Sequence, residues 1–193
     1  MLSWPLVYRL WQAPFAERKF APVLAHNDLA AVRRVLDVAC GPGTNARHFA
    51  KVFYLGLDLS TRYVAEARRR LGQAFIAADA ARLPVRRRCF DFVLVNSFFH
   101  HVDTPTARAI LASLREALSE NGHIHVLDLA LPNRPGVARL LARLDRGKFA
   151  RPLEEWRALF SEQFEPLVFE PYSLGMGGST FWHMVYFKGR RHA

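Results

Sequence analysis

Short apolar runs and longer amphipathic stretches alternate along the chain from residue 34 onward. The apolar runs are rich in β-branched and aliphatic residues, which is typical of strands buried in a parallel sheet. The amphipathic stretches repeat their apolar positions at helical spacing, so strand and helix alternate. The pattern predicts an α/β fold with helices on both faces of a sheet. The strands predicted in this part are 34–38, 53–59, 74–80, 90–96 and 123–131.

Capping residues set the bounds of the predicted helices. One helix is expected directly after the first strand, in 44–50. A second lies between Ser60, a typical N-cap, and Gly72, a typical helix end. A third begins at Thr104-Pro105, a cap followed by proline, and ends at Asn121-Gly122.

The regular alternation stops after residue 131. Segment 132–163 is predicted as a helical insertion, followed by apolar segments at 164–174 and 180–188. The loop between these segments is too short for a helical crossover, so they should form an antiparallel hairpin. We expect one domain over 1–193, with the parts described as an N-terminal lid at 1–30, a core at 31–131, a substrate cap at 132–163 and a C-terminal hairpin at 164–193.

The composition is that of a folded domain with excess positive charge. Hydrophobic residues make up 51% and charged residues 23% of the chain, which argues against disorder. The formal net charge of +10 favours an anionic partner, whether a substrate, a membrane surface or a nucleic acid. Two cysteines, Cys40 and Cys89, suggest neither a disulfide framework nor a metal cage, so a reducing cytoplasm is expected. The apolar segment 1–11 lacks a basic leader and contains Pro5, so we expect neither a signal peptide nor a membrane span.

The clearest chemical signal is the strand 34–38, which runs directly into a glycine turn. Gly41 and Gly43 lack a Cβ atom, so the turn can lie against a ligand. With Ala46 they also fit a dinucleotide fingerprint, which is weak by itself. Asp37 lies beside the turn, where its carboxylate would repel a pyrophosphate and attract a cation.

Three aspartates follow the same rule, because each stands at the carboxyl end of a predicted strand. They are Asp37, Asp58 and Asp79. Ligands of open α/β sheets bind at that edge. Asp58 comes one strand–helix–strand unit after Asp37, where a carboxylate accepts both hydroxyls of a ribose. Asp79 comes one unit later, where it can receive an adenine amino group.

Together these residues resemble the class I S-adenosylmethionine-dependent methyltransferases. Asp37-x-Ala39-x-Gly41-x-Gly43 looks like the first motif of that family, with alanine at a position where the family usually has glycine. The segment 90–101 resembles the fourth motif and 122–128 the strand after it. The resemblance covers 31–131.

The resemblance implies a Rossmann-like, doubly wound, seven-stranded sheet that is mostly parallel with a reversed last strand. It also implies S-adenosyl-L-methionine as cofactor and S-adenosyl-L-homocysteine as product. No metal is expected. The residues that match cofactor-binding positions are Asp37, Ala39, Gly41, Gly43, Asp58, Leu59, Asp79, Ala80 and Asn96.

His100 and His101 are the first candidates for catalysis, because they directly follow the fourth strand. A histidine there can take a proton from a phenol, an enol or an amine, although both side chains could instead shape the loop. Lys19 is a candidate partner of the methionine carboxylate, or else a solvated lysine. Other candidates for contacts with substrate or cofactor are Tyr8 and Trp11 in the lid, and His125, Asp128, Tyr172, Met176 and His183 on the far wall.

The leading hypothesis is C-, O- or N-methylation of a small, largely apolar acceptor. Asn96 is followed by Ser97 rather than by the Pro-Pro-aromatic sequence of amino-directed nucleic-acid and protein methyltransferases. RNA methylation nevertheless stays open because of the charge, as does a cofactor-binding protein that regulates or does not methylate. A nicotinamide-dependent oxidoreductase is disfavoured by Asp37.

The insertion contains a basic amphipathic segment over 134–151. Its predicted apolar stripe is Val137, Leu140, Leu141 and Leu144, between arginines and lysines. Such a helix can lie on an anionic membrane or cover a lipid-like or anionic substrate. It can equally be a cap that packs on the domain with solvated arginines.

Overall fold

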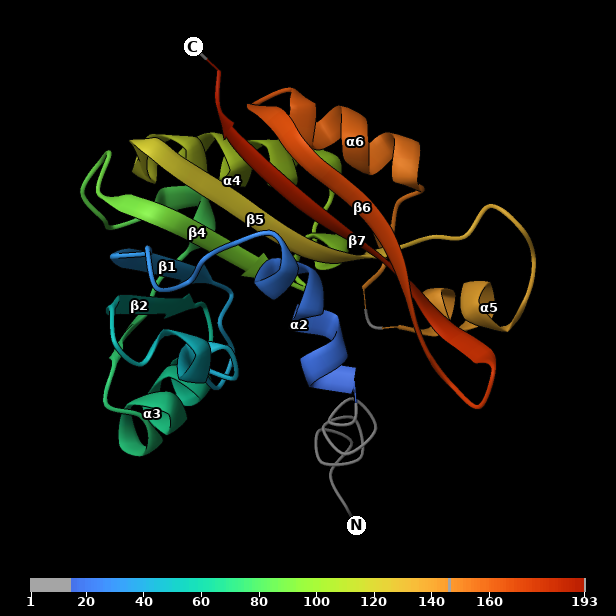
Figure 1. Ribbon diagram of the computed structural model, residues 1–193, viewed down its shortest axis with the longest axis horizontal. Helices are drawn as coiled ribbons and strands as arrows, with labels where there is room; N and C mark the ends of the chain where they lie inside the picture. Colours follow the sequence, from blue (N-terminus) through green and yellow to red (C-terminus); the bar gives the residue numbers. More distant parts are fainter. Residues whose placement is uncertain (1–14, 146, 193) are drawn as a thin grey trace.

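The computed structural model describes residues 15–145 and 147–192 (Figure 1). The predicted lid residues Tyr8 and Trp11 lie outside the described residues. The described part of the lid is the helix α2 (Ala16–Ala25).

The seven strands form one sheet in the order β3-β2-β1-β4-β5-β7-β6. Neighbouring strands are parallel except for β7, which is antiparallel to both β5 and β6. This confirms the doubly wound sheet with a reversed last strand and the C-terminal hairpin. The bounds are β1 (Arg34–Val38), β2 (Phe53–Asp58), β3 (Ala74–Ala77), β4 (Phe90–Asn96), β5 (Leu118–Ala130), β6 (Phe164–Met176) and β7 (Ser179–Arg191).

Helices cover both faces of the sheet (Figure 1). On one face α4 (Thr104–Ala117) and α6 (Leu153–Ser161) bury Ile110, Leu114 and Phe160 against the strands. On the other face α2, the 3₁₀ turn η2 (Ala46–Phe49) and α3 (Thr61–Arg70) bury a second cluster that includes Phe20 and Val64. The sheet is therefore buried on both sides, which explains its nearly continuous apolar strands.

The predicted cap Ser60 is confirmed, whereas three other helix predictions are wrong. Asp103, rather than Thr104, caps α4, because its carboxylate accepts a hydrogen bond from the Thr106 amide. Ser60 caps α3, because its hydroxyl accepts a hydrogen bond from the Tyr63 amide. The segment 44–50 forms only the short turn η2 instead of an α-helix. α4 ends at Ala117 rather than at Asn121-Gly122, because Leu118 is fully buried and already pairs with Phe90 of β4. Tertiary pairing thus overrides the local stop signal.

The insertion contains α5 (Val137–Leu144) and α6. α5 does not pack on the domain through its predicted apolar stripe. Val137, Leu140 and Leu144 are exposed at 64%, 58% and 70%, and the helix buries Ala142 instead. Arg151 is buried rather than part of a solvated basic face, since its guanidinium donates to the carbonyls of the turn η4 (Phe99–His101) and of Val102. None of the described helices is both long and apolar enough to cross a bilayer.

Candidate functional site

The carboxylate of Asp37 is fully buried at the end of β1. One oxygen accepts hydrogen bonds from the Tyr54 hydroxyl at 2.6 Å and from the Asn45 amide at 3.2 Å. The other oxygen, Oδ1, has no partner among the described residues. Burial raises the pKa of Asp37 to about 7, although the hydrogen bonds from Tyr54 and Asn45 oppose that shift. The open oxygen of Asp37 can therefore accept a hydrogen bond from a cationic ligand.

A second orphaned acceptor belongs to Asn96, at the end of the neighbouring strand β4. The Asn96 amide donates to Asn45 Oδ1 at 3.1 Å, and its own Oδ1 is buried without a partner among the described residues. A chain of side-chain contacts thus runs from Asp37 through Asn45 to Asn96. Buried acceptors are normally satisfied, so two open ones at neighbouring strand ends indicate a place for a ligand with N–H groups. Sequence reasoning missed Asn45, whose position directly after the glycine turn was the available signal.

Asp58 holds the glycine turn in place. Its two oxygens accept hydrogen bonds from the amides of Gly41 and Ser60, each at 2.8 Å. A carboxylate has about four acceptor positions. Asp58 therefore retains lone pairs for hydroxyl donors while it fixes the loop.

The two glycines of the turn have different roles. Gly41 has φ +55°, and a Cβ atom there would meet nothing within 4 Å, so the turn borders open space. Gly43 has φ +80°, and a Cβ atom would lie 2.6 Å from Leu71 and 2.9 Å from Phe75. Both glycines thus adopt the left-handed conformation that the predicted turn needs, Gly43 also lacks room for a Cβ atom beside Leu71 and Phe75, and its contact with a ligand stays a prediction. Ala39 adopts φ 56°, a left-handed conformation that favours glycine.

The third predicted acid lies at the outer end of the same edge. Asp79 is exposed and caps the turn η3 (Ala80–Arg82) through a 2.9 Å hydrogen bond from the Ala81 amide. Ala80 is buried, whereas Leu59, directly after Asp58, is 77% exposed. The strands β1, β2 and β3 are neighbours, so the structure brings the three acids to one edge as predicted.

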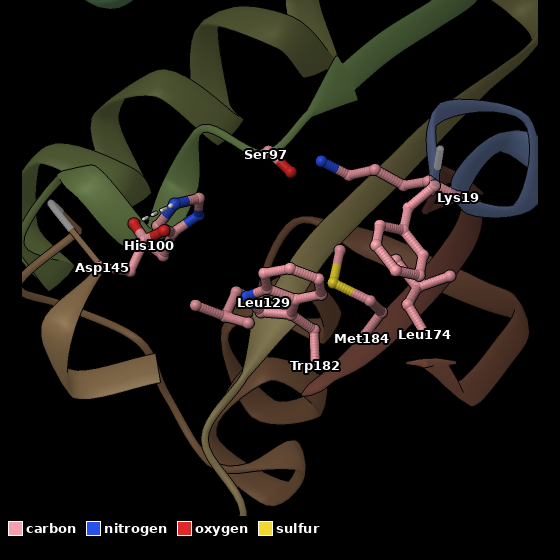
Figure 2. Close-up of a pocket in the computed structure, with 9 residues that line it drawn as sticks. Lys19, Ser97, His100, Leu129, Asp145, Leu174, Trp182 and Met184 are labelled. Carbon is pink, nitrogen blue, oxygen red and sulfur yellow. Dashed lines mark ion pairs between the residues drawn. The ribbon is translucent and has the colours of Figure 1, made fainter. Parts of the chain in front are cut away.

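A small pocket of about 20 Å³ lies beside the end of β4 (Figure 2). One side of the pocket is polar and the other is apolar. The polar side consists of Lys19, Ser97, His100 and Asp145, and the apolar side of Phe15, Leu129, Leu174, Trp182 and Met184.

His100 lies between two carboxylates. Its Nδ1 is 2.5 Å from Asp128 Oδ1, and its Nε2 is 3.4 Å from Asp145 Oδ1. The loop after α5 covers the ring closely, because a Cβ atom on Gly147 would lie 2.0 Å from His100 Cδ2. Asp128 also accepts the Phe99 amide at 2.7 Å, so it fixes the turn η4 as well as the ring.

The ionisation of His100 follows from this geometry. Burial alone would lower the pKa of the imidazole, but Asp128 and Asp145 outweigh it and raise the pKa to about 9. The pKa of Asp145 falls to about 2, because hydrogen bonds from His100 and from the Gly147 amide overcome its burial. His100 is therefore an imidazolium with both nitrogens engaged. This arrangement favours the protonated ring and so opposes the predicted role of His100 as a general base, which stays a prediction.

His101 is exposed and is not among the residues that line the pocket, so a catalytic role for it stays a prediction. Donor atoms of His100, His101 and Asp145 do lie within 4.8 Å of one another, which is a spacing that a metal ion can use. The proton on His100 Nε2 opposes metal binding in this arrangement.

Four of the other predicted contacts lie elsewhere. Tyr172 donates its hydroxyl to the carbonyl of Lys19 and so positions α2, while Met176 is 69% exposed near the tip of the hairpin. His125 is buried and stacks on Phe92 in the core. His183 lines a separate cavity of about 460 Å³ under the loop 130–139.

The comparisons with known proteins agree with this arrangement. Residues 35–122 match the family model described as a methyltransferase domain. Over these residues the chain is similar to the methyltransferase domain family. The matched residues include every predicted cofactor position from Asp37 to Asn96.

The relatives match this chain in part. A trans-aconitate 2-methyltransferase from Methylobacterium nodulans is 42% identical over 88 residues, which are 43% of this chain and 34% of that protein. A demethylmenaquinone methyltransferase from Beutenbergia cavernae is 35% identical over 102 residues, 51% of this chain and 42% of that protein. The chain thus spans less than half the length of these two relatives.

The fold extends the likeness over nearly the whole chain. The PH0226 protein from Pyrococcus horikoshii superposes with a TM-score of 0.75 at 17% identity, covering 94% of this chain and 92% of that one. At this identity the likeness concerns the fold alone.

Proposed function

We propose that this chain transfers a methyl group from S-adenosyl-L-methionine to a small, largely apolar acceptor. The observation that carries the proposal is the pair of orphaned acceptors, Asp37 Oδ1 and Asn96 Oδ1, beside the open space at Gly41. The methionine end of the cofactor carries an ammonium group, which supplies the N–H donors that these oxygens lack.

The remaining residues fit the rest of the cofactor. Asp58 would accept the ribose hydroxyls, Asp79 the adenine amino group, and Leu59 would lose its solvent exposure against the adenine ring. When bound, the cofactor supplies an electrophilic methyl group on a positively charged sulfur. What this chain contributes is alignment of the acceptor with that group and exclusion of water.

The pocket beside β4 supports a small acceptor. Its apolar side, which includes Leu129 and Met184, would hold a hydrocarbon part of the acceptor. Its polar side includes Ser97, directly after the end of β4. The names of the relatives support the same size class, since they refer to trans-aconitate and demethylmenaquinone. Within the residues that the structure describes, these observations favour a small molecule over RNA.

Two further proposals concern where the protein acts. Cys40 and Cys89 are both free thiols, which supports a reducing compartment such as the cytoplasm. The exposed apolar stripe of α5 (Val137, Leu140 and Leu144), with exposed Arg134 and Arg143 nearby, supports peripheral contact with an anionic membrane.

Calorimetric titration with S-adenosyl-L-homocysteine tests the proposal. We expect one site per chain, no binding of NAD, and at least tenfold weaker binding in Asp37→Asn because a charge-assisted hydrogen bond is lost. Glu120→Gln removes an exposed carboxylate and should leave the affinity unchanged. Failure of the wild type to bind the homocysteine product would sink the proposal.

A further inference from the structure

The Lys19 side chain enters the pocket beside the end of β4 from α2. Over residues 15–145 and 147–192 its ammonium makes neither a hydrogen bond nor an ion pair. Burial lowers the pKa of Lys19 to about 8, and the charges of Asp128 and Asp145 only partly oppose that shift. A sheltered ammonium without a partner costs free energy, so a ligand that pairs with it is expected.

Ser97 lies opposite Lys19 on the polar side of the pocket. Figure 2 shows the Lys19 ammonium pointing toward the Ser97 hydroxyl. Ser97 has φ 57°, a strained conformation for a residue with a side chain, and it occupies the strand end after Asn96. Strain of this kind is concentrated at functional sites. Two donors from different elements thus converge on one point.

Neither of the two other ionisable side chains that line the described part of the pocket, His100 and Asp145, is suited to deprotonate an acceptor near neutral pH. His100 already carries its proton, and the Asp145 carboxylate has a pKa of about 2, which makes it too weak a base. The charge of His100 offsets that of one of the two aspartates, and Lys19 is the pocket's other cation and the group available to pair with an anion. An acceptor that suits this pocket arrives already ionised.

We propose that Lys19 and Ser97 bind a carboxylate of the acceptor, so that the acceptor class is an apolar carboxylic acid and the reaction is its O-methylation. This inference rests on the proposed methyl transfer. One carboxylate oxygen receives the hydrogen bonds of Lys19 and Ser97. The other oxygen gives its electron pair to the methyl carbon, and the carbon–sulfur bond breaks with its pair staying on sulfur. The products are a neutral ester and a neutral thioether, and no proton is released.

The position of Lys19 favours the acceptor over the cofactor's own carboxylate. The orphaned acceptors Asp37 and Asn96 place the methionine end at β1 and β4, whereas the pocket with Lys19 is closed by Leu129 of β5 and by Trp182 and Met184 of β7.

The size of the pocket sets a condition. About 20 Å³ admits one water-sized group, so the pocket must widen to accept the carboxylate of an acid. The body of the acceptor requires the segment with Asp145 to move. α5, which precedes it, buries Ala142 and leaves three large apolar side chains exposed.

The test uses the full chain loaded with S-adenosyl-L-homocysteine. Calorimetry compares three acids (octanoate, benzoate and trans-aconitate) with octanamide, benzamide and trans-aconitic triamide in the wild type, Lys19→Met and Lys19→Arg. Lys51→Met, which removes an exposed lysine, is the matched control. We expect at least one acid to bind or, with the methyl donor, to form its methyl ester, and its amide to bind at least tenfold more weakly. Lys19→Met should lose tenfold or more of the acid affinity, and Lys19→Arg should regain part of it.

Acid binding should also weaken as the pH rises through about 8, because neutral Lys19 no longer attracts an anion. Asp128, Asp145 and His100 also face Lys19. Neither aspartate changes its charge near pH 8, and His100 loses its proton only at about pH 9. A loss of homocysteine-product affinity in Lys19→Met would overturn the proposal in favour of the cofactor carboxylate. Equal binding of acids and amides, or binding of none of the acids, would overturn it as well. If the wild type does not bind the homocysteine product, the proposed function itself has failed.

Discussion

The Tyr172 hydroxyl lies 2.9 Å from the main-chain oxygen of Lys19, so the hairpin fixes the helix that carries the pocket's ammonium. Tyr172→Phe removes one hydrogen bond and should lower the free energy of unfolding by about 1 kcal/mol. It should also raise KM for the acceptor more than it lowers kcat, because Lys19 becomes less well placed. Urea unfolding and steady-state kinetics measure these effects. Tyr63→Phe on the exposed face of α3 is the control and should change neither quantity.

The contact of His100 with Asp128 and Asp145 should make stability depend on pH. The folded-state pKa of His100 is raised from 6.5 to about 9, so its contribution is complete below pH 6.5 and is lost as the pH rises through about 9. Lys19 titrates in part of the same range, so the informative quantity is the difference between wild type and His100→Gln. This difference should shrink by an amount on the order of 3 kcal/mol between pH 6 and 9.5. Parallel unfolding curves over that range would show that the imidazole is not held as a cation.

The open oxygen of Asp37 should make cofactor binding depend on pH. The pKa of Asp37 is raised to about 7, and an ammonium ligand binds the ionised form. Affinity for S-adenosyl-L-homocysteine should therefore rise with pH up to about 7 and level off above it, by at most about tenfold per pH unit. Asp37→Asn should abolish the slope. The same slope in that variant would assign the titration to another group.

Ala39 occupies a left-handed conformation next to the glycine turn. That conformation costs a residue with a Cβ atom about 1–2 kcal/mol, and glycine loses about 0.5–1 kcal/mol through its greater freedom when unfolded. Ala39→Gly should thus stabilise the protein by roughly 0.5 kcal/mol in urea unfolding. Ala65→Gly on the exposed face of α3 should instead destabilise it by about 1 kcal/mol, since a helix interior disfavours glycine. Destabilisation by both changes would argue against strain at position 39.

The exposed stripe of α5 should bind anionic bilayers. The full chain should sediment with phosphatidylglycerol vesicles and much less with phosphatidylcholine vesicles. The double change Leu140→Ser and Leu144→Ser should weaken that binding at least tenfold, because each buried leucine contributes about 1.5–3 kcal/mol. Leu167→Ser, at an exposed leucine of β6, is the matched control. Unchanged sedimentation of the double variant would leave net charge as the cause of any binding.

The residues proposed to bind the cofactor could be predicted from local sequence. Those proposed to bind the acceptor could not, because they meet only when the C-terminal hairpin folds back on the rest of the chain. Asp37, Asp58 and Asp79 each follow an apolar strand, and parallel neighbours must bring such residues to one edge. Lys19 lines the same pocket as Trp182 and Met184 because the hairpin packs beside α2. No spacing pattern in the sequence predicts that arrangement. The charge on His100 likewise depends on the register of β4 with β5, which places Asp128 beside it. Asp128 was predicted as a possible contact on the far wall, but its pairing with His100 could not be predicted from the sequence.

The family match ends at residue 122, and most of the pocket is built from residues outside it: Phe15, Lys19, Leu129, Asp145, Leu174, Trp182 and Met184. The ends of β6 and β7 project past the remaining strands toward α5 (Figure 1). Substitutions on this overhang leave the nucleoside cradle untouched. Under the proposed function, the identity of the acceptor could consequently change during evolution while the residues proposed to bind the methyl donor stay constant.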